Sequence, residues 1–162
     1  MALDYFLQID GIAGESVDAK HKGAIDLLSW TWGESNIGPH SSGSGGGASR
    51  VQFQDLHFTA PVSKASPALF LACATGQHFK QAKLSAQRAA AKGGAGDFLT
   101  WTFSDVLVTS YQTGGSEPQT APIDSISLNF SKAQISYKAQ KADGSFDTAI
   151  TAGFDVKTQT KA

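Results

Sequence analysis

The chain has 162 residues, of which 41% are hydrophobic and 17% charged, enough apolar material for one core in a single domain over residues 1–162. Its 13 Lys and Arg residues nearly balance 14 Asp and Glu residues, and the net charge of −1 argues against a general nucleic-acid binder, which should be basic. The single cysteine, Cys73, excludes a disulfide framework within the chain.

The N-terminal segment is predicted to form a strand over residues 4–10. Asp4 and Asp10 bracket a short apolar run that contains Gln8, and no Lys or Arg precedes it. A secretory leader needs a basic start and about 7–15 apolar residues, so we expect synthesis in the cytosol and, for an exported protein, export without a signal peptide. The apolar run at 68–74 is far shorter than the ~20 residues of a membrane span, so no membrane partner is expected.

Most of the remaining chain alternates apolar and polar side chains, a pattern typical of strands with one packed and one wet face. The stretches with this alternation are 28–32, 99–103, 126–130, 135–137 and, with one parity from Phe146 to Val156, 146–156. The Asp143-Gly144 dipeptide between the last two stretches is a hairpin signal.

Two segments change the parity of their apolar residues. Val51 and Phe53 are odd-numbered whereas Leu56 and Phe58 are even-numbered, and a second change follows Phe130. Because a slip of one residue moves every side chain to the other face, each change predicts a bulge or a bend, which lets one strand serve two sheets or close a barrel.

One helix is predicted, over residues 66–76. Ser66 suits the N-cap, Pro67 the first helical position and Gly76 the C-terminal cap. The helix is apolar nearly all round, which indicates packing into the body of the protein, and Cys73 on it is interpreted as a core residue. The expected fold class is mainly β (α+β): a two-sheet β-barrel or sandwich with one α-helix.

Residues 36–50 are rich in Gly and Ser and lie between two predicted strands of the same domain. Loops of this length without structure are usually functional or disordered. Residues 43–48 match the letters of the dinucleotide fingerprint G-x-G-x-x-A, but a strand pattern follows where that motif needs a helix, so a flexible loop is the favoured interpretation.

No catalytic or metal-binding constellation is apparent. The four histidines, His21, His40, His57 and His78, lack zinc spacing, and neither G-x-S-x-G nor H-E-x-x-H occurs. We therefore expect no enzyme activity, no metal and no cofactor. The three tryptophans would suit a stacking platform for bases or sugars, but the surrounding alternation favours the core. The expected class of function is therefore an assembly or binding module, with a monomeric β-barrel that binds a small ligand as the alternative.

An ordered series of motifs along the whole chain resembles the haemolysin-coregulated protein (Hcp) family, the tail-tube protein of bacterial type VI secretion. The series includes DYFLQI at 4–9, GIAGES at 11–16, IDLLSWTWG at 25–33, QDLHFT at 54–59, SPAL at 66–69, ACATG at 72–76 and KADG at 141–144. The resemblance implies a two-sheet β-barrel with one helix, assembled as a homo-hexameric ring.

The same resemblance implies that the rings stack into a tube that is expelled through a contractile sheath. The lumen would carry secretion effectors, and the sheath, spike and baseplate proteins of the system would be further partners. It implies a bacterial cytoplasmic protein that is then secreted without a cleaved signal. Some relatives carry a toxin domain after the tube module, and none is expected beyond Ala162.

Candidate residues for the lumen follow from the parity of residues 28–32. If Leu28, Trp30 and Trp32 point into the core, Ser29 and Thr31 point the other way. In the family this strand contributes to the inner wall, so Ser29 and Thr31 are expected to face the bore and contact effectors.

The glycine-rich segment is the natural arm to reach a neighbouring subunit, in the same ring or in the next one. A loop that orders on docking loses entropy, which would keep stacking reversible. The residues assigned to this contact are Gly38, His40, Gly43, Gly45, Gly46, Gly47 and Arg50.

Overall fold

The computed structural model describes residues 3–36, 50–90 and 94–162, and within them it is mainly β with one helix, as expected. The elements are β1 (Asp4–Ile9), β2 (Ile25–Leu27), β3 (Ser29–Thr31), β4 (Glu34–Asn36), β5 (Val51–Phe53), β6 (Leu56–Pro61), α1 (Ser66–Thr75), β7 (His78–Ala90), β8 (Gly94–Gly114), β9 (Ile123–Asn129), β10 (Lys132–Tyr137), β11 (Ile150–Asp155) and β12 (Thr160–Lys161).

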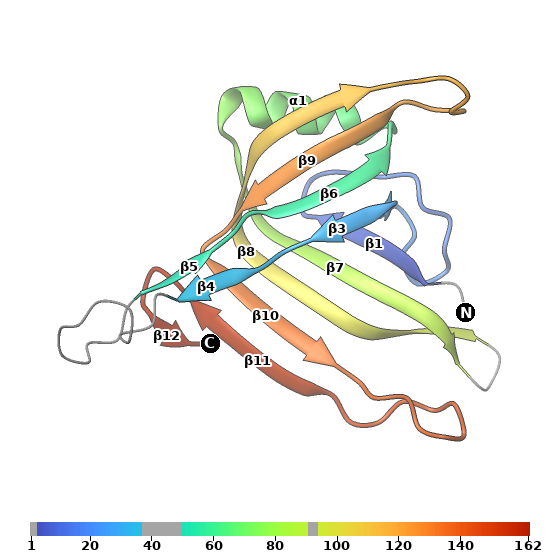
Figure 1. Cartoon of the computed structure of the whole chain (residues 1–162), viewed down its shortest axis with the longest axis vertical. Helices are drawn as coiled ribbons and strands as arrows, with labels where there is room; N and C mark the ends of the chain where they lie inside the picture. Colours follow the sequence, from blue (N-terminus) through green and yellow to red (C-terminus); the bar gives the residue numbers. More distant parts are fainter. Residues whose placement is uncertain (1–2, 37–49, 91–93) are drawn as a thin grey trace.

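The long strand β8 organises the main sheet. It pairs with β7 along one edge, and its other edge takes β10 over residues 99–104 and β9 over residues 107–114. β7 leads on to β1 and β2, whereas β9 leads on to β6 and β3. The sheet therefore folds over as two facing layers (Figure 1), a sandwich-like arrangement that is not closed into a barrel.

The core lies between the two layers. Side chains at alternate positions of both layers are fully buried, and Ile126, Leu128 and Phe130 confirm the predicted alternation of that stretch. The largest side chains that are completely enclosed are Leu7, Leu56, Phe58, Leu84, Phe103 and Ile126. Burial of these apolar surfaces is the main force that holds the layers together.

Both predicted changes of parity occur at changes of strand partner. β5 pairs with β4 in a separate two-stranded ribbon, whereas β6, which begins three residues after Phe53, pairs with β3 and β9. Likewise β9 ends at Asn129 and β10 begins at Lys132, where the chain moves to another part of β8. The first bend lets one stretch of chain serve two sheets, whereas the second takes the chain from one part of the main sheet to another.

The helix has the predicted C-terminal cap. Gly76 adopts φ 69°, a left-handed conformation that glycine takes without steric cost, and its N–H donates to the Ala72 carbonyl at 3.0 Å. The N-cap prediction is wrong, because Ala65 holds that position. The Ser66 hydroxyl instead donates to the buried Asp124 carboxylate of β9 at 2.5 Å, which also accepts from Tyr111 at 3.1 Å.

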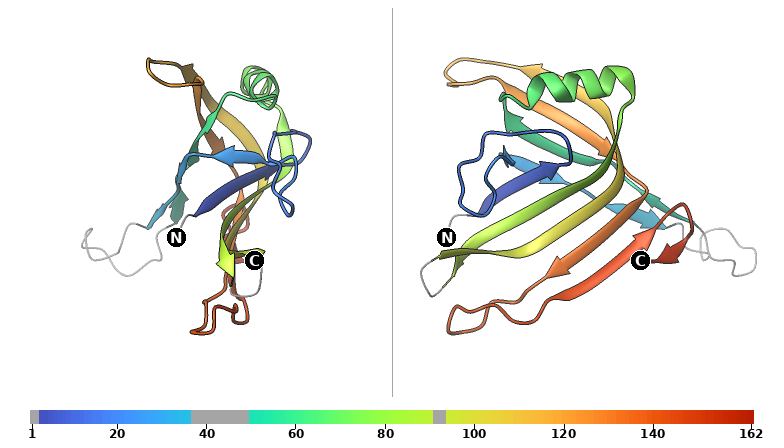
Figure 2. Two further views of the ribbon diagram at one scale, coloured as in Figure 1. Left: turned by 90° about the vertical axis from the view of Figure 1, so that its right-hand side faces the viewer. Right: turned by 180° about the vertical axis from the view of Figure 1, so that it is seen from behind.

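The expected burial of the helix on nearly all sides is also wrong. α1 lies across the outside of β8 (Figure 2), so only one of its faces is covered. Leu69 and Ala72 are buried and Cys73 packs against the core, whereas Phe70 and Leu71 are more than half exposed. No helix within the described residues is long and apolar enough to cross a membrane.

The Asp143-Gly144 turn joins β10 and β11 as predicted, with Gly144 at φ 83°. The single strand expected from Phe146 to Val156 is shorter than that, because β11 begins at Ile150, which is 72% exposed. Phe146 lies before the strand, with its ring against the backbone of Gly96 on β8, where a side chain would not fit.

Candidate functional site

Ser29 and Thr31 lie on β3 and are both exposed. Trp30 between them is half-buried and packs edge-on against Tyr5, with ring centroids 6.1 Å apart, so the alternation around Trp30 is as predicted. Leu28 does not follow it, because its side chain is 54% exposed. It lies at the break between β2 and β3, where the chain leaves β1 as partner and joins β6.

The outward side of β3, β6 and β9 is a continuous polar surface, which we call the hydroxyl face. Cross-strand register places Thr59 between Ser29 and Ser125, and the Ser29 and Thr59 hydroxyls are 2.6 Å apart. Two residues further along each strand, a second row of polar side chains runs across the three strands beside the first row. The residues of the hydroxyl face are Ser29, Thr31, His57, Thr59, Ser125 and Ser127.

His57 occupies the middle of the second row. It pairs with Thr31 on one side and with Ser127 on the other, and its Nδ1 is 3.1 Å from the Ser127 hydroxyl. His57 lies on the face opposite Phe58, since Phe58 is fully buried and His57 is exposed. The sequence alone did not connect His57 with Thr31, because parity gives the face of each strand but not the register between strands.

Asp55, which directly precedes β6, has a carboxylate that is held by polar groups. Thr109 donates to one oxygen of Asp55 at 2.6 Å, and the Asn129 amide donates to the other at 3.0 Å. Both oxygens of Asp55 are thus engaged by neutral donors at the margin of the hydroxyl face.

The inner side of this region is a rigid aromatic cluster around Trp32. The Trp32 ring lies 5.4 Å from Phe53, 4.8 Å from Trp101 and 5.8 Å from Phe130 between centroids, and its Nε1 donates to the Gln54 carbonyl at 2.9 Å. All three tryptophans are partly buried and pack against the core rather than lying within it, and the rings around Trp32 anchor the base of the β4–β5 ribbon.

The β4–β5 ribbon connects the hydroxyl face to the glycine-rich segment. Arg50, which directly precedes β5, is exposed. The other residues assigned to stacking, Gly38, His40, Gly43, Gly45, Gly46 and Gly47, lie outside the described residues.

The histidines elsewhere have local partners. His21 Nε2 is 2.7 Å from Asp97, and its ring stacks on Phe6 at 4.5 Å between centroids. His78, which follows the helix, has its Nδ1 3.0 Å from an Asp105 carboxylate oxygen. Across residues 3–36, 50–90 and 94–162, no three His, Cys, Asp or Glu side chains gather as a metal site.

Asp105 joins three segments of the chain. It lies at the bend of β8 with φ 57°, and it contacts His78 of β7 and, at 2.5 Å, Lys157 after β11. The hydrogen bond from Lys157, followed by that from His78, holds the pKa of the Asp105 carboxyl below its usual value. The pKa of Lys157 is raised by the same pair.

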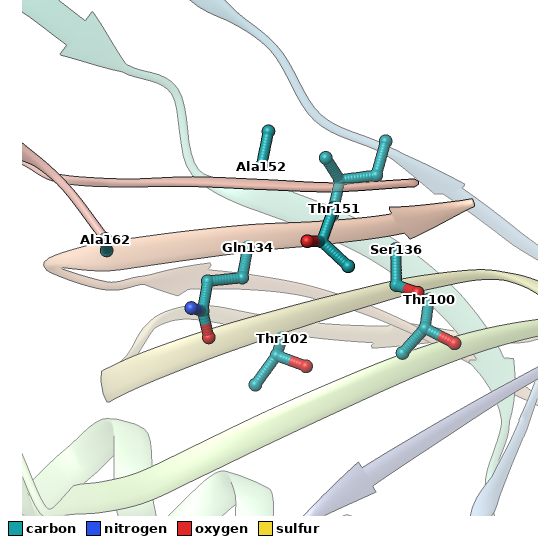
Figure 3. Close-up of a pocket in the computed structure, with 8 residues that line it drawn as sticks. Thr100, Thr102, Gln134, Ser136, Thr151, Ala152 and Ala162 are labelled. Carbon is teal, nitrogen blue, oxygen red and sulfur yellow. The ribbon is translucent and has the colours of Figure 1, made fainter. Parts of the chain in front are cut away.

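A shallow depression of about 290 Å³ lies on the outer side of β8, β10 and β11 (Figure 3). Thr100, Thr102, Gln134, Ser136 and Thr151 contribute uncharged polar groups to it. Among these side chains there is no nucleophile with an adjacent base.

Both the sequence and the fold are similar to those of known proteins. The sequence profile of the family described as "Type VI secretion system effector, Hcp" matches residues 6–137. Protein hcp1 of Pseudomonas aeruginosa is 39% identical over 163 residues, with all of both chains covered. The crystal structure of Hcp1 from Salmonella typhimurium has a TM-score of 0.80 at 36% identity, with both chains covered completely. A structure described as a type six secretion system protein has a TM-score of 0.91 at 28% identity, covering 99% of this chain and 100% of that one.

Proposed function

The chain belongs to the Hcp family of type VI secretion system proteins, and on this premise we propose that six copies close into a ring and that such rings stack into a secreted tube. The observation that carries the proposal is the match over the whole length of both chains to protein hcp1. Effectors travel in the lumen of this tube, and the sheath, spike and baseplate proteins of the system are its further partners.

In this proposal the hydroxyl face lines the bore, with Ser29 and Thr31 in contact with effectors. Its rows consist mainly of short neutral side chains that are bonded to one another, as in the 2.6 Å contact between Ser29 and Thr59. Short neutral groups offer hydrogen bonds to a passenger without a fixed charge that would hold it tightly. The fully buried Phe58 on the reverse side keeps the wall rigid.

The outer edge of β11 supports closure with a second copy. β12 covers this edge only at Phe154 and Asp155, so the residues from 150 to 152 have no strand partner there among the described residues. Tyr137 and Ile150 are exposed beside it. An open edge with apolar side chains favours association. In a closed head-to-tail ring, the open edge of each protomer is covered by the next protomer.

The β4–β5 ribbon supports a stacking role for residues 36–50. It carries Arg50 and the attached glycine-rich segment, while Phe53 at its base packs against Phe130 and Phe154 at 5.7 and 6.3 Å between centroids. Because its base is packed against the body of the protomer, the ribbon would hold the docked arm in a fixed position relative to that body. We assign Gly38, His40, Gly43, Gly45, Gly46, Gly47 and Arg50 to contacts with a neighbouring subunit.

The proposed role is structural and requires no bond-breaking chemistry of the chain itself. The protein is made in the bacterial cytoplasm and leaves with the tube. The comparisons do not support the alternative of a monomeric barrel that binds a small ligand.

Light scattering on a sizing column tests closure through the β11 edge. The wild-type chain is expected to elute with the mass of six protomers, and Ile150→Lys to shift this mass towards one. Val17→Lys is the matched control, because Val17 is 94% exposed and distant in sequence from β11. Equal hexamer content in wild type and Ile150→Lys would contradict the assigned edge, and a monomeric wild type would contradict the ring.

A further inference from the structure

A small pocket, which we call the ribbon pocket, lies between the β4–β5 ribbon and strands β10 and β11. Its volume is about 170 Å³, and the aromatic rings of Trp32, Phe53 and Trp101 contribute to its lining. On the side of β11 the lining consists of Ala152 and Gly153 together with one further ring. Because these residues of β11 are short, they leave room for a side chain beside the rings.

One carboxylate belongs to the lining of the ribbon pocket. Glu34 of β4 is two residues after Trp32 and is opposite Phe53 in the register of the ribbon, so all three lie on the same face. Glu34 is exposed, and within residues 3–36, 50–90 and 94–162 no ion pair involves it. The faces of aromatic rings attract cations as well. The ribbon pocket therefore suits a positively charged group.

Arginine is the cation that fits such a lining best, because its planar guanidinium stacks on aromatic rings and pairs with carboxylates. The chain has two arginines. The guanidinium of Arg88 already lies over the ring of Phe98, 3.8 Å from its centroid. Arg50, which directly precedes β5, is exposed and forms no ion pair in the part of the chain that the structure describes. Arg50 is thus the arginine available for a contact outside its own protomer.

The position of Arg50 on the ribbon directs it away from the ribbon pocket of its own protomer. Val51 and Phe53 are half-buried, whereas Gln52 between them is exposed. Since side chains alternate along a strand, Arg50 shares the face of Gln52 and not that of Phe53. The ribbon therefore carries an aromatic and acidic pocket on one face and an arginine on the other.

We infer that Arg50 of one protomer docks in the ribbon pocket of a second copy, where its guanidinium stacks on the rings and pairs with Glu34. The inference rests on the proposed function, in which Arg50 contacts a neighbouring subunit, and it names the surface that receives Arg50. Because pocket and arginine lie on opposite faces of the ribbon, the contact is head-to-tail, so each protomer donates one arginine and receives one.

Two single charge reversals test the inference by light scattering over a series of protein concentrations at low salt. Glu34→Arg makes the pocket positive, and Arg50→Glu makes the arm negative, so each variant alone brings like charges together at the contact. Each is expected to need at least about tenfold more protein than the wild type for half-maximal assembly. Circular dichroism records whether each variant is folded.

An equimolar mixture of the two variants locates the contact between copies. The reversed pocket of one variant meets the reversed arm of the other, and the two unchanged partners also match. Assembly of the mixture is therefore expected to return to the wild-type concentration. A contact within one protomer would give no such rescue, because neither variant carries both reversals.

Glu117→Arg is the matched control. Glu117 is also exposed and lies in the loop between β8 and β9, and its reversal changes the net charge by the same amount as Glu34→Arg. This variant is expected to assemble as the wild type does. A loss as large as that of Glu34→Arg would assign the effect to net charge and would overturn the contact.

The outcomes separate this inference from the proposed ring. If both single reversals assemble at the wild-type concentration, or if their mixture stays as impaired as its components, the contact between Arg50 and the ribbon pocket is overturned and the ring is not. A wild-type chain that stays a single protomer under every condition overturns both.

Discussion

Thr31 on β3 and His57 on β6 are opposite residues of one antiparallel pair, and His57 is in turn opposite Ser127 on β9. Three strands that are far apart in the sequence thus present one row of polar side chains on the outward surface, while Trp30, Phe58 and Ile126 form the matching row within. A change of size or charge in the outer row alters the surface without touching the core.

Replacement of Thr31 by tryptophan is expected to leave the ring intact and to weaken effector loading. A bulky ring placed where a passenger packs costs about 1–3 kcal/mol, which corresponds to about 5- to 150-fold in loading. Mass spectrometry of effectors that co-purify with the ring from the native strain measures this. Thr102→Trp, on the outer side of the other layer, is the control, and unchanged loading with Thr31→Trp would count against the lumen assignment.

Deletion of residues 43–47 is expected to impair stacking or ring assembly while each protomer stays folded. The shortened arm would no longer reach its neighbour, but the β4–β5 ribbon and its aromatic base do not depend on these residues. Circular dichroism reports the fold, and electron microscopy reports tube length. Tubes of normal length from the deletion would refute a stacking role.

Phe58→Ala is expected to destabilise the protomer by about 3–5 kcal/mol, because a fully buried aromatic side chain leaves a cavity between the two layers. Denaturant unfolding measures the change. The control is Val17→Ala, whose exposed side chain predicts a loss within about 0.5 kcal/mol. A similar small loss for both would mean that the layers do not pack through Phe58.

The Asp105 cluster predicts an acid-sensitive contribution to stability. Because hydrogen bonds from Lys157 and then His78 lower the pKa of Asp105 below its usual 3.8, its contribution is present above that value and is lost as the pH falls through the lowered pKa. The difference in melting temperature between wild type and Asp105→Asn should therefore be constant above about pH 5 and close towards pH 2.

Lys157→Met should remove most of this difference, because the Lys157 hydrogen bond is the largest cause of the lowered pKa of Asp105. Asparagine tolerates the left-handed backbone at position 105, so the comparison isolates the charge. A difference that stays constant down to pH 2 would contradict the role of the carboxylate.

Much of the fold was predictable from local patterns. The alternation at 126–130, the Gly76 cap and the Asp143-Gly144 turn each depend on a few neighbouring residues, so each was correct. Ser66 was misassigned because its partner, Asp124, is 58 residues away. Leu28 was misassigned because the strand changes partner at that residue, from β1 to β6, and the sequence contains no signal for that change.

The candidate site was likewise predictable only where it depends on local sequence patterns. Parity placed Ser29 and Thr31 on outward faces correctly. Their assembly into one surface depends on the register between β3, β6 and β9, which long-range packing of the buried rows determines. The exposed positions of Phe70 and Leu71 likewise follow from where α1 lies on β8, and a helix with a uniformly apolar sequence does not indicate which side is covered.

Electron microscopy of the purified protein tests the central claim most directly. We expect annular particles with six-fold symmetry and an open centre, and end-to-end stacks of them at high concentration. Solitary protomers without a central opening, at every concentration and salt condition examined, would contradict the account.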